Sequence, residues 1–221
     1  MIPKIIHYCW FGPNKKSPEF EKYLTSWKQN LPDYEIIEWN ESNFDYNRYL
    51  YSREAFRMSC YAHVSDVCRI HVLHEIGGIY LDTDVEVLKS FDNFLKFDSF
   101  VGTEFKYIGT GDIASKPGMK WLKSFLEYYA DRHFINRFGH PRRRPNTKIL
   151  TTTILPRLDA NTWPAIFPKD YFCGKDWTTG QSIITENTVS LHHYEASWRR
   201  KRSLSDKIKI LLKGIKARYS K

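Results

Sequence analysis

The chain alternates short apolar runs with segments in which apolar residues recur at helical spacing. Residues 4–10 form an apolar run typical of a buried strand, and residues 34–39 form a second one. Between them, Pro18–Asn30 carries apolar side chains three and four positions apart, which predicts an amphipathic helix. This alternation of strand and helix predicts an α/β fold with a Rossmann-like sheet.

The remaining pattern continues the alternation. Apolar spacing predicts helices over residues 52–60, 119–130 and 149–158, and a strand over residues 100–106. Residues 107–113 are glycine-rich, and the pattern assigns them no element. These glycines lack the strand-GxxxxGK-helix arrangement, so they do not indicate a phosphate-binding loop.

Residues 65–85 combine a helical pattern, a glycine pair and a short strand. Gly77 and Gly78 can adopt the backbone conformations that end a helix and turn the chain sharply. The strand Ile79-Tyr80-Leu81 then leads into Asp82-Thr83-Asp84. Two carboxylates therefore follow the carboxyl end of a strand, where open α/β sheets bind their ligands.

The two aspartates indicate a divalent cation site. Side chains alternate along a strand, so Asp82 and Asp84 share a face if the strand continues through Thr83. A hard cation such as Mg, Ca or Mn relieves the repulsion between them and keeps coordination positions open for phosphate oxygens. The alternative is a surface turn whose aspartates cap a helix.

Asp66 and Arg69 lie three residues apart and so share a face of the preceding helix. A carboxylate that accepts and a guanidinium that donates a fork of hydrogen bonds can together hold vicinal sugar hydroxyls. The alternative is a local ion pair, which stabilises a helix by only about 0.2–0.5 kcal/mol.

Length and composition favour one folded domain. The 221 residues include 7 Trp, 14 Tyr and 14 Phe, a content that suits a site that stacks on nucleotide or sugar rings. The four cysteines have no zinc-site spacing and are predicted to be small buried residues in a reducing compartment.

The net charge of +9 lies entirely in the tail, residues 199–221, which holds ten basic residues and one acid. An S-x-x-D cap at Ser203 and apolar residues at helical spacing predict a basic amphipathic helix there. Such a helix fits an anionic membrane surface; the alternative is a helix packed on the domain. No aromatic interleaving or nucleic-acid motif accompanies the charge, so nucleic acid is not a predicted partner.

A second basic cluster, Arg142-Arg143-Arg144, falls in a polar loop over residues 132–148. A run of like charges is usually a solvated face. The alternative is a docking site for an anionic acceptor, such as a lipid-linked diphosphate.

Three motifs in order resemble glycosyltransferase family 32, the DXD-containing family to which the catalytic domains of the large clostridial glucosylating toxins are related. They are IPKIIHYCWFG at the start, the stretch from Ser65-Asp66 to Asp84, and a late LHHYEASW. The central stretch matches at Ser65-Asp66, Arg69, Gly77-Gly78, Tyr80 and Asp82-Thr83-Asp84. The similarity covers most of residues 1–198.

This resemblance implies a GT-A type fold over residues 1–198, followed by the tail. It implies a retaining glycosyltransferase that uses Mn²⁺ or Mg²⁺ and a nucleotide-sugar donor, with a UDP-sugar expected. Asp82 and Asp84 would hold the metal and Asp66 and Arg69 would contact the donor sugar, these four forming the expected catalytic set. Two further residues are expected to bind the donor, Trp10 by stacking on the base and Tyr80.

The late motif adds three expected contacts. His193 would complete the metal shell, while Ser197 and the Trp198 indole N-H would donate to the diphosphate. His192 would point to the opposite side if this segment is a strand, and the sequence leaves open which histidine contacts the metal. Where the family often has asparagine, this chain has Gly111-Asp112. Asp112 is therefore only a candidate for sugar or acceptor contact.

The expected acceptor is a surface glycan or lipid-linked saccharide, as in capsule or lipopolysaccharide assembly. Alternatives are a toxin-like protein glucosyltransferase, a metal-dependent phosphohydrolase and a non-catalytic glycan-binding module. The chain has no apolar run of eighteen residues and no signal-peptide pattern. The expected location is therefore the cytoplasm, with the tail on the inner face of the membrane.

Overall fold

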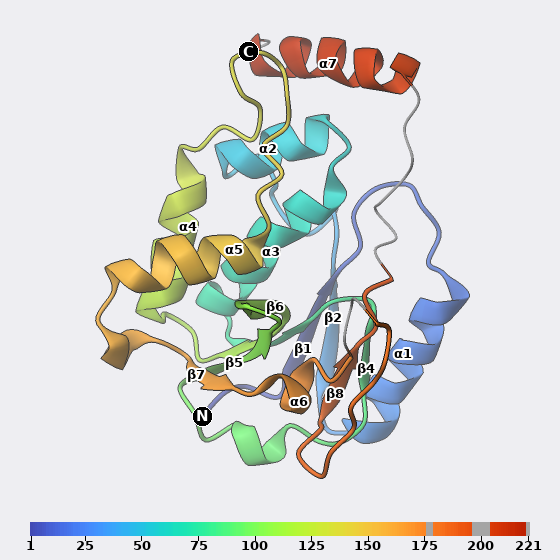
Figure 1. Ribbon diagram of the computed structural model, residues 1–221, viewed down its shortest axis with the longest axis vertical. Coiled ribbons are helices and arrows are strands. Elements are labelled where there is room, and N and C mark those ends of the chain that lie inside the picture. Colours follow the sequence, from blue (N-terminus) through green and yellow to red (C-terminus); the bar gives the residue numbers. More distant parts are fainter. Residues whose placement is uncertain (176–178, 196–203, 220–221) are drawn as a thin grey trace.

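The computed structural model describes residues 1–175, 179–195 and 204–219, and its centre is a six-stranded sheet with helices on both faces (Figure 1). The strands are β1 Ile5–Cys9, β2 Glu35–Trp39, β3 Gly78–Leu81, β4 Val85–Val87, β5 Ser99–Glu104, β6 Tyr107–Ser115, β7 Ala165–Phe167 and β8 Ser190–His192. The α-helices are α1 Pro18–Asn30, α2 Leu50–Arg57, α3 Tyr61–Glu75, α4 Lys120–Ala130, α5 Asn146–Ile149, α6 Lys169–Phe172 and α7 Leu204–Tyr219. Other helical turns are η1 Asp92–Phe94, η2 Leu150–Ile154, which is a π-helix, η3 Leu155–Arg157 and η4 Ala160–Thr162.

The main sheet has the strand order β2-β1-β3-β6-β5-β7. Strand β1 pairs in parallel with β2 and β3, whereas β6 pairs antiparallel with β3 and β5. A separate two-stranded sheet pairs β4 with β8. The α/β prediction is confirmed, with a parallel half that contains β1, β2 and β3.

Each face of the main sheet covers its own apolar core. Along β3, Ile79 and Leu81 point into the core under α1, while Tyr80 points into the core under α2, α3 and α4. This is the alternation of a strand buried on both sides. Helix α1 begins as its sequence dictates, because Ser17 accepts a hydrogen bond from the Phe20 N-H and Pro18 starts the first turn.

Two local features differ from the sequence pattern. Strand β3 ends at Leu81, and Asp82 to Val85 forms a turn in which the Val85 N-H donates to the Asp82 carbonyl, so the strand does not continue through Thr83. Residues 107–113, to which the pattern assigns no element, are most of strand β6 in the middle of the sheet. Glycines at alternate positions remove the side chains that would reveal the strand period.

Helix α7 lies across the end of α2, away from the sheet (Figure 1). It approaches the 133–142 loop through small residues: a Cβ added at Gly139 would lie 2.7 Å from Ile215 Cγ1, and Gly214 lies against the backbone of Gly139. Ala217 is buried, whereas Leu212 and Tyr219 are 62% and 66% exposed. Over residues 211–219, the helix thus packs by its small residues and turns large apolar side chains outward.

Within the described residues, no helix combines the length and apolar character needed to cross a membrane. Cys9, Cys68 and Cys173 are buried, as predicted for small apolar side chains, whereas Cys60 is only partly buried.

The turn from α3 into β3 predicts a measurable difference between two glycines. Gly77 and Gly118 have nearly the same backbone, with φ of +75° and +74°, but a Cβ on Gly77 would lie 2.8 Å from Pro117 Cδ and 2.9 Å from the Ser115 carbonyl oxygen. Nothing lies within 4 Å of a Cβ on Gly118. We expect Gly77→Ala to lower the free energy of unfolding by about 3 kcal/mol, from strain plus overpacking. Gly118→Ala should cost about 1 kcal/mol, from strain alone. Urea unfolding of both variants measures the difference, and equal losses would contradict the packing at Gly77.

Candidate active site

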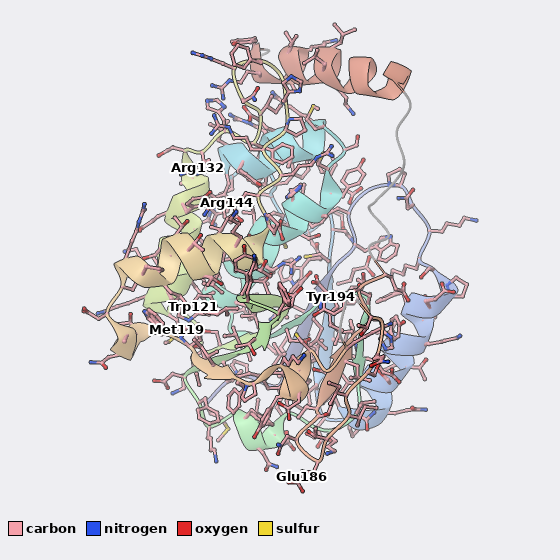
Figure 2. The ribbon with its side chains drawn as sticks, viewed as in Figure 1. Met119, Trp121, Arg132, Arg144, Glu186 and Tyr194 are labelled. Atoms are coloured by element: carbon pink, nitrogen blue, oxygen red, sulfur yellow. The ribbon has the colours of Figure 1, made fainter. Side chains whose placement is uncertain are left out.

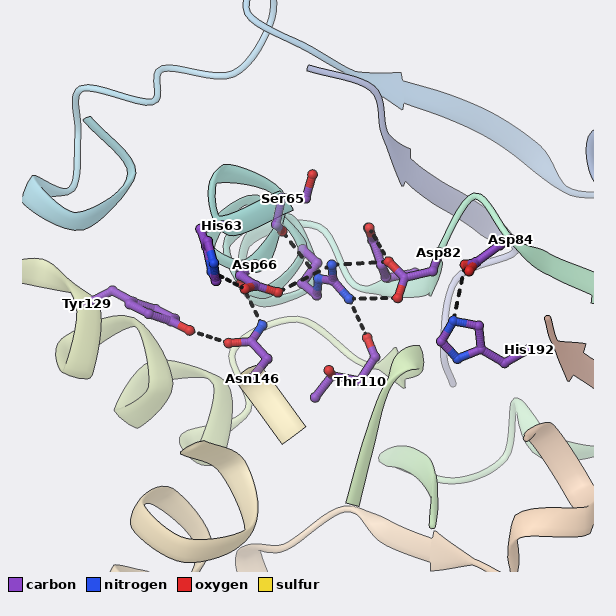
Figure 3. A network of polar contacts seen from close by, with 11 residues as sticks. His63, Ser65, Asp66, Asp82, Asp84, Thr110, Tyr129, Asn146 and His192 are labelled. Carbon is purple, nitrogen blue, oxygen red and sulfur yellow. Dashed lines mark hydrogen bonds and ion pairs between the residues drawn. The ribbon is translucent and has the colours of Figure 1, made fainter. Parts of the chain in front are cut away.

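The two aspartates of the motif face different neighbours at the end of β3 (Figure 3). The backbone N-H of Asp82 donates to the Gly111 carbonyl over 2.8 Å, which extends the β3–β6 pairing by one residue. Asp84 lies beyond the turn, next to β4, and β4 pairs with β8 so that Val85 is opposite His192. Asp82 is therefore tied to the main sheet and Asp84 to the small one.

Arg69 holds the Asp82 carboxylate in place. Its Nη2 lies 3.1 Å from Asp82 Oδ1 and its Nη1 lies 3.3 Å from Oδ2, a paired contact with both oxygens. The Tyr80 hydroxyl donates to Oδ1 over 3.0 Å, and the guanidinium lies 4.4 Å from the centre of the Tyr80 ring. Burial raises the pKa of Asp82, and the charge of Arg69 opposes that rise.

The same guanidinium connects three further groups. Nη1 donates to the Thr110 carbonyl over 2.6 Å, Nε donates to the Ser65 carbonyl over 3.3 Å, and Nη2 lies 3.4 Å from Asp66 Oδ1. Asp66 and Arg69 thus share a helix face, as their spacing predicts. Burial alone would lower the pKa of Arg69, but Asp82, Tyr80 and Asp66 raise it well above its usual value.

Asp84 is held by the small sheet. His192 Nε2 lies 3.1 Å from its Oδ1, and the Glu195 backbone N-H donates to Oδ2 over 3.0 Å. Burial opposes the charge of Asp84, but His192 and these hydrogen bonds lower its pKa below the usual value. Burial likewise opposes the charge of His192, and Asp84 outweighs it, so the pKa of His192 is raised well above its usual value.

Asp82, Asp84 and His192 fit a divalent cation. One ligand atom from each lies within 4.8 Å of the others, and the carboxylates keep 26% and 20% of their side-chain surface exposed. Gly111 leaves the space between them open, because a Cβ there would lie 2.8 Å from His192 Cε1 and 3.1 Å from Asp82 Oδ2. His192 Nδ1 is buried without a hydrogen-bond partner among the described residues. Carboxylates with an imidazole form a chemically reasonable donor set for such an ion.

His192, rather than His193, is the histidine that lies with the two aspartates. The His193 ring stacks on Tyr23 at 4.8 Å, and its Nε2 lies 2.8 Å from Glu86 Oε2. The antiparallel register of β4 and β8, which brings His192 opposite Val85, separates the two histidines. The predicted contacts of Ser197 and Trp198 lie outside the described residues.

The two residues expected to bind the donor lie in different surroundings. The Trp10 indole donates to the Asn14 carbonyl over 2.8 Å, and its ring packs 5.4 Å from Phe20. Tyr80 is 1% exposed and is covered by Arg69, so it positions Asp82 in this conformation. A direct contact of either ring with a nucleotide stays a prediction.

Among the buried groups beside the aspartates, the sequence pattern assigned no role to Thr110 and Gly111 and indicated Asp112 only as a candidate for sugar or acceptor contact. Thr110 offers its carbonyl to Arg69, and Gly111 opens the cation space. Asp112, opposite Leu81 in the sheet, is 2% exposed; its Oδ1 has no partner among the described residues, and burial raises its pKa to about 8. The strand period that could have revealed them is hidden by the glycines of β6.

Comparison with known families shows what the region around the two aspartates is similar to. Residues 17–101 match the family described as "Glycosyltransferase sugar-binding region containing DXD motif". This part of the chain is therefore similar to a glycosyltransferase sugar-binding region. The matched sugar-binding region contains Asp66, Arg69, Asp82 and Asp84, while Gly111 and His192 lie beyond its end.

A curated relative is similar to part of this chain. Inositol phosphoceramide mannosyltransferase 3 of Schizosaccharomyces pombe is 31% identical over 109 residues, which cover 45% of this chain and 29% of the relative. The chain therefore spans under a third of the length of the curated relative it matches.

Solved structures resemble this chain in fold. The apo-form glycosyltransferase GlyE of Streptococcus pneumoniae TIGR4 aligns with a TM-score of 0.52 and 9% identity, over 96% of this chain and 60% of that chain. The PaToxG glycosyltransferase aligns with a TM-score of 0.45 and 21% identity, over 57% of this chain and 59% of that chain. The expected GT-A type fold is confirmed.

Proposed function

We propose that this protein is a metal-dependent retaining glycosyltransferase that moves a sugar from a nucleotide-sugar to a surface-glycan or lipid-linked saccharide acceptor. A UDP-sugar is the expected donor. The proposal rests on the meeting of Asp82, Asp84 and His192 around the space that Gly111 leaves open, with both aspartates inside the matched sugar-binding region. In this proposal residues 1–198 form the catalytic domain and residues 199–221 the tail.

Asp82, Asp84 and His192 are the proposed metal ligands, with His192 in the place that the sequence gave to His193. The mixed carboxylate and imidazole set favours Mn²⁺ over Mg²⁺, since imidazole suits transition ions. When bound, such a cation would neutralise the donor diphosphate and the charge that develops on the leaving group.

The chain's own residues would bind and orient the donor. Arg69 keeps Asp82 fixed, so the carboxylate need not reorganise when the donor arrives. Asp66, with 14% of its side chain exposed, can accept from a sugar hydroxyl beside Arg69. Trp10 remains the proposed partner of the base, and Ser197 and Trp198 remain the proposed donors to the diphosphate. Retention without a named protein nucleophile is proposed from the resemblance to family 32.

The name of the curated relative couples mannosyl transfer with inositol phosphoceramide. This supports an acceptor that is a lipid bearing a phosphate, within the lipid-linked class proposed above. A surface glycan in capsule or lipopolysaccharide assembly is the other member of that class.

Donor turnover tests the proposal. With Mn²⁺, the protein should release nucleoside diphosphate from one nucleotide-sugar in a panel, and Asp84→Asn should lower that rate at least about a hundredfold because a metal ligand is lost. The matched control is Glu86→Gln, two residues further along, whose carboxylate contacts His193 instead of the aspartates. It should keep the rate within about threefold.

Three results would contradict the proposal in different ways. Phosphate release from nucleotides that carry no sugar would indicate a phosphohydrolase. Glycan binding in EDTA without turnover of any nucleotide-sugar would indicate a binding module. Equal rates for Asp84→Asn and wild type in Mn²⁺ would remove the metal assignment.

We also propose that the tail binds the anionic inner face of the cell membrane, which would make this a peripheral enzyme of the cytoplasm. Helix α7 turns Leu212 and Tyr219 outward, and Phe138 on the adjoining loop is 61% exposed. Lys213 is exposed on the same helix, whereas the guanidinium of Arg218 turns to the domain and lies 3.8 Å from Glu54 Oε1. Exposed apolar side chains among basic ones are the combination that binds anionic headgroups.

Vesicle sedimentation tests this surface. Leu212→Ser with Tyr219→Ser should weaken binding to vesicles of phosphatidylserine and phosphatidylcholine at least about tenfold, since two apolar side chains leave the bilayer. The matched control is Ile183→Ser with Ile184→Ser, which removes an exposed apolar pair elsewhere. Equal binding of the two double variants, or no preference of wild type for anionic vesicles, would contradict a membrane role.

A further inference from the structure

Two adjoining hollows lie on the helical side of the molecule, away from the aspartates. The smaller has a volume of about 210 Å³ and is lined by Tyr51, Tyr128, Arg132, Arg142, Arg144 and Ile149. The larger, of about 650 Å³, shares Tyr128, Arg132 and Arg142 with it and adds Arg157. We call the pair the arginine hollow, after Arg132, Arg142, Arg144 and Arg157. Figure 2 labels Arg132 and Arg144 close to each other beside α4 and α5.

The charge of the arginine hollow is not balanced by the protein. Three arginines and no acid line the smaller part. Glu127 and Asp131 line the larger part, but in the described ranges no carboxylate forms an ion pair with any of the four arginines. Positive side chains that converge on one space repel each other, and an anion in that space would relieve the repulsion.

Two of these guanidinium groups are already oriented. Arg144 Nη2 donates to Thr152 Oγ1 over 2.6 Å, while its Nε is buried with no hydrogen-bond partner among the described residues. The Arg132 guanidinium lies 3.9 Å from the centre of the Tyr128 ring, and its Nε donates to the Tyr128 carbonyl over 3.3 Å. A buried donor without a partner costs stability, so an acceptor from a ligand would satisfy it.

The backbone around Arg142 is also fixed. Its N-H donates to the Phe134 carbonyl over 2.7 Å, and its carbonyl accepts from the Tyr51 hydroxyl over 3.3 Å. Hydrogen bonds at both the N-H and the carbonyl of Arg142 therefore hold this part of the loop in place. The run 142–144 is thus only in part a solvated face: Arg142 and Arg143 are exposed and Arg144 is partly buried, but only Arg142 and Arg144 line the hollow.

One layer of side chains separates the arginine hollow from Asp66. The Tyr51 ring, which lines the hollow, lies 6.4 Å from the His63 ring, and His63 Nδ1 lies 3.1 Å from Asp66 Oδ2. Asn146, two residues after Arg144, donates to the Asp66 carbonyl over 3.1 Å (Figure 3). A ligand in the hollow would thus be separated by Tyr51 and His63 from Asp66, the residue proposed to contact the donor sugar.

We propose that the arginine hollow binds a phosphate or diphosphate group of the acceptor. That this ligand is an acceptor rests on the proposed glycosyl transfer. Guanidinium forks match phosphate oxygens in pairs, which an ammonium group cannot do. The acceptor class is then a phosphorylated saccharide, soluble or linked to a lipid through its phosphate. The donor diphosphate would instead be held at the DXD turn.

Binding of inorganic pyrophosphate, measured by calorimetry without metal or donor, tests the hollow directly. Arg132→Gln with Arg144→Gln should weaken binding at least about tenfold, and higher salt should weaken binding to wild type. Arg143→Gln, between two lining residues but outside the hollow, is the matched control and should stay within about twofold. Arg144→Lys keeps the charge and loses the fork, so it should fall between them. Thermal unfolding checks that each variant is folded.

A second readout separates this inference from the proposed function. In the double variant, hydrolysis of the nucleotide-sugar in Mn²⁺ should be unchanged, while the KM for a phosphorylated acceptor rises at least about tenfold. A soluble sugar phosphate and a lipid-linked diphosphate saccharide, assayed side by side, show which source is used.

No pyrophosphate binding by wild type, or equal loss in Arg143→Gln, would overturn the inference even if donor turnover is found. If no donor is turned over, the proposed function fails, and the pyrophosphate titration still decides whether the hollow binds phosphate.

Discussion

The ion pair between Arg69 and Asp82 is the contact on which the rest of the site depends. Arg69 is 5% exposed, and one guanidinium contacts Asp66 of α3, Asp82 at the end of β3 and the Thr110 carbonyl of β6. A buried charge of this kind is stable only when its partners are in place, because removing one leaves the other uncompensated. The pair therefore fixes a helix, two strands and the first aspartate of the motif relative to one another.

The DXD turn joins two sheets, and each aspartate belongs to a different one. Asp82 continues the pairing of β3 with β6, while Asp84 is held by residues that lie in or just after β8. The three potential ligands of a cation therefore come from segments more than a hundred residues apart in the sequence. Gly111 permits the approach, since a side chain there would fill the space between His192 and Asp82. In our proposal, the cation would bridge the two sheets and complete the site.

Local signals in the sequence predicted the local parts of this structure. Apolar spacing over Pro18–Asn30 predicted α1, and the spacing of Asp66 and Arg69 placed both on one face of α3. The contact between Arg69 and Asp82 was not predictable, because it depends on how α3 packs against β3 across thirteen residues. The choice between His192 and His193 depends on the register of β4 with β8, because a shift of one residue exchanges the two faces of a strand. Strand β6 was missed because its glycines hide the alternation of apolar side chains.

Pulsed electron paramagnetic resonance of the Mn²⁺-loaded protein tests the central claim most directly, since it detects nitrogen bound to the ion. The account predicts a coupling to an imidazole nitrogen that disappears in His192→Gln and persists in His193→Gln. A coupling that survives in His192→Gln, or a bound ion with no coupled nitrogen in the wild type, would contradict a cation site built from Asp82, Asp84 and His192.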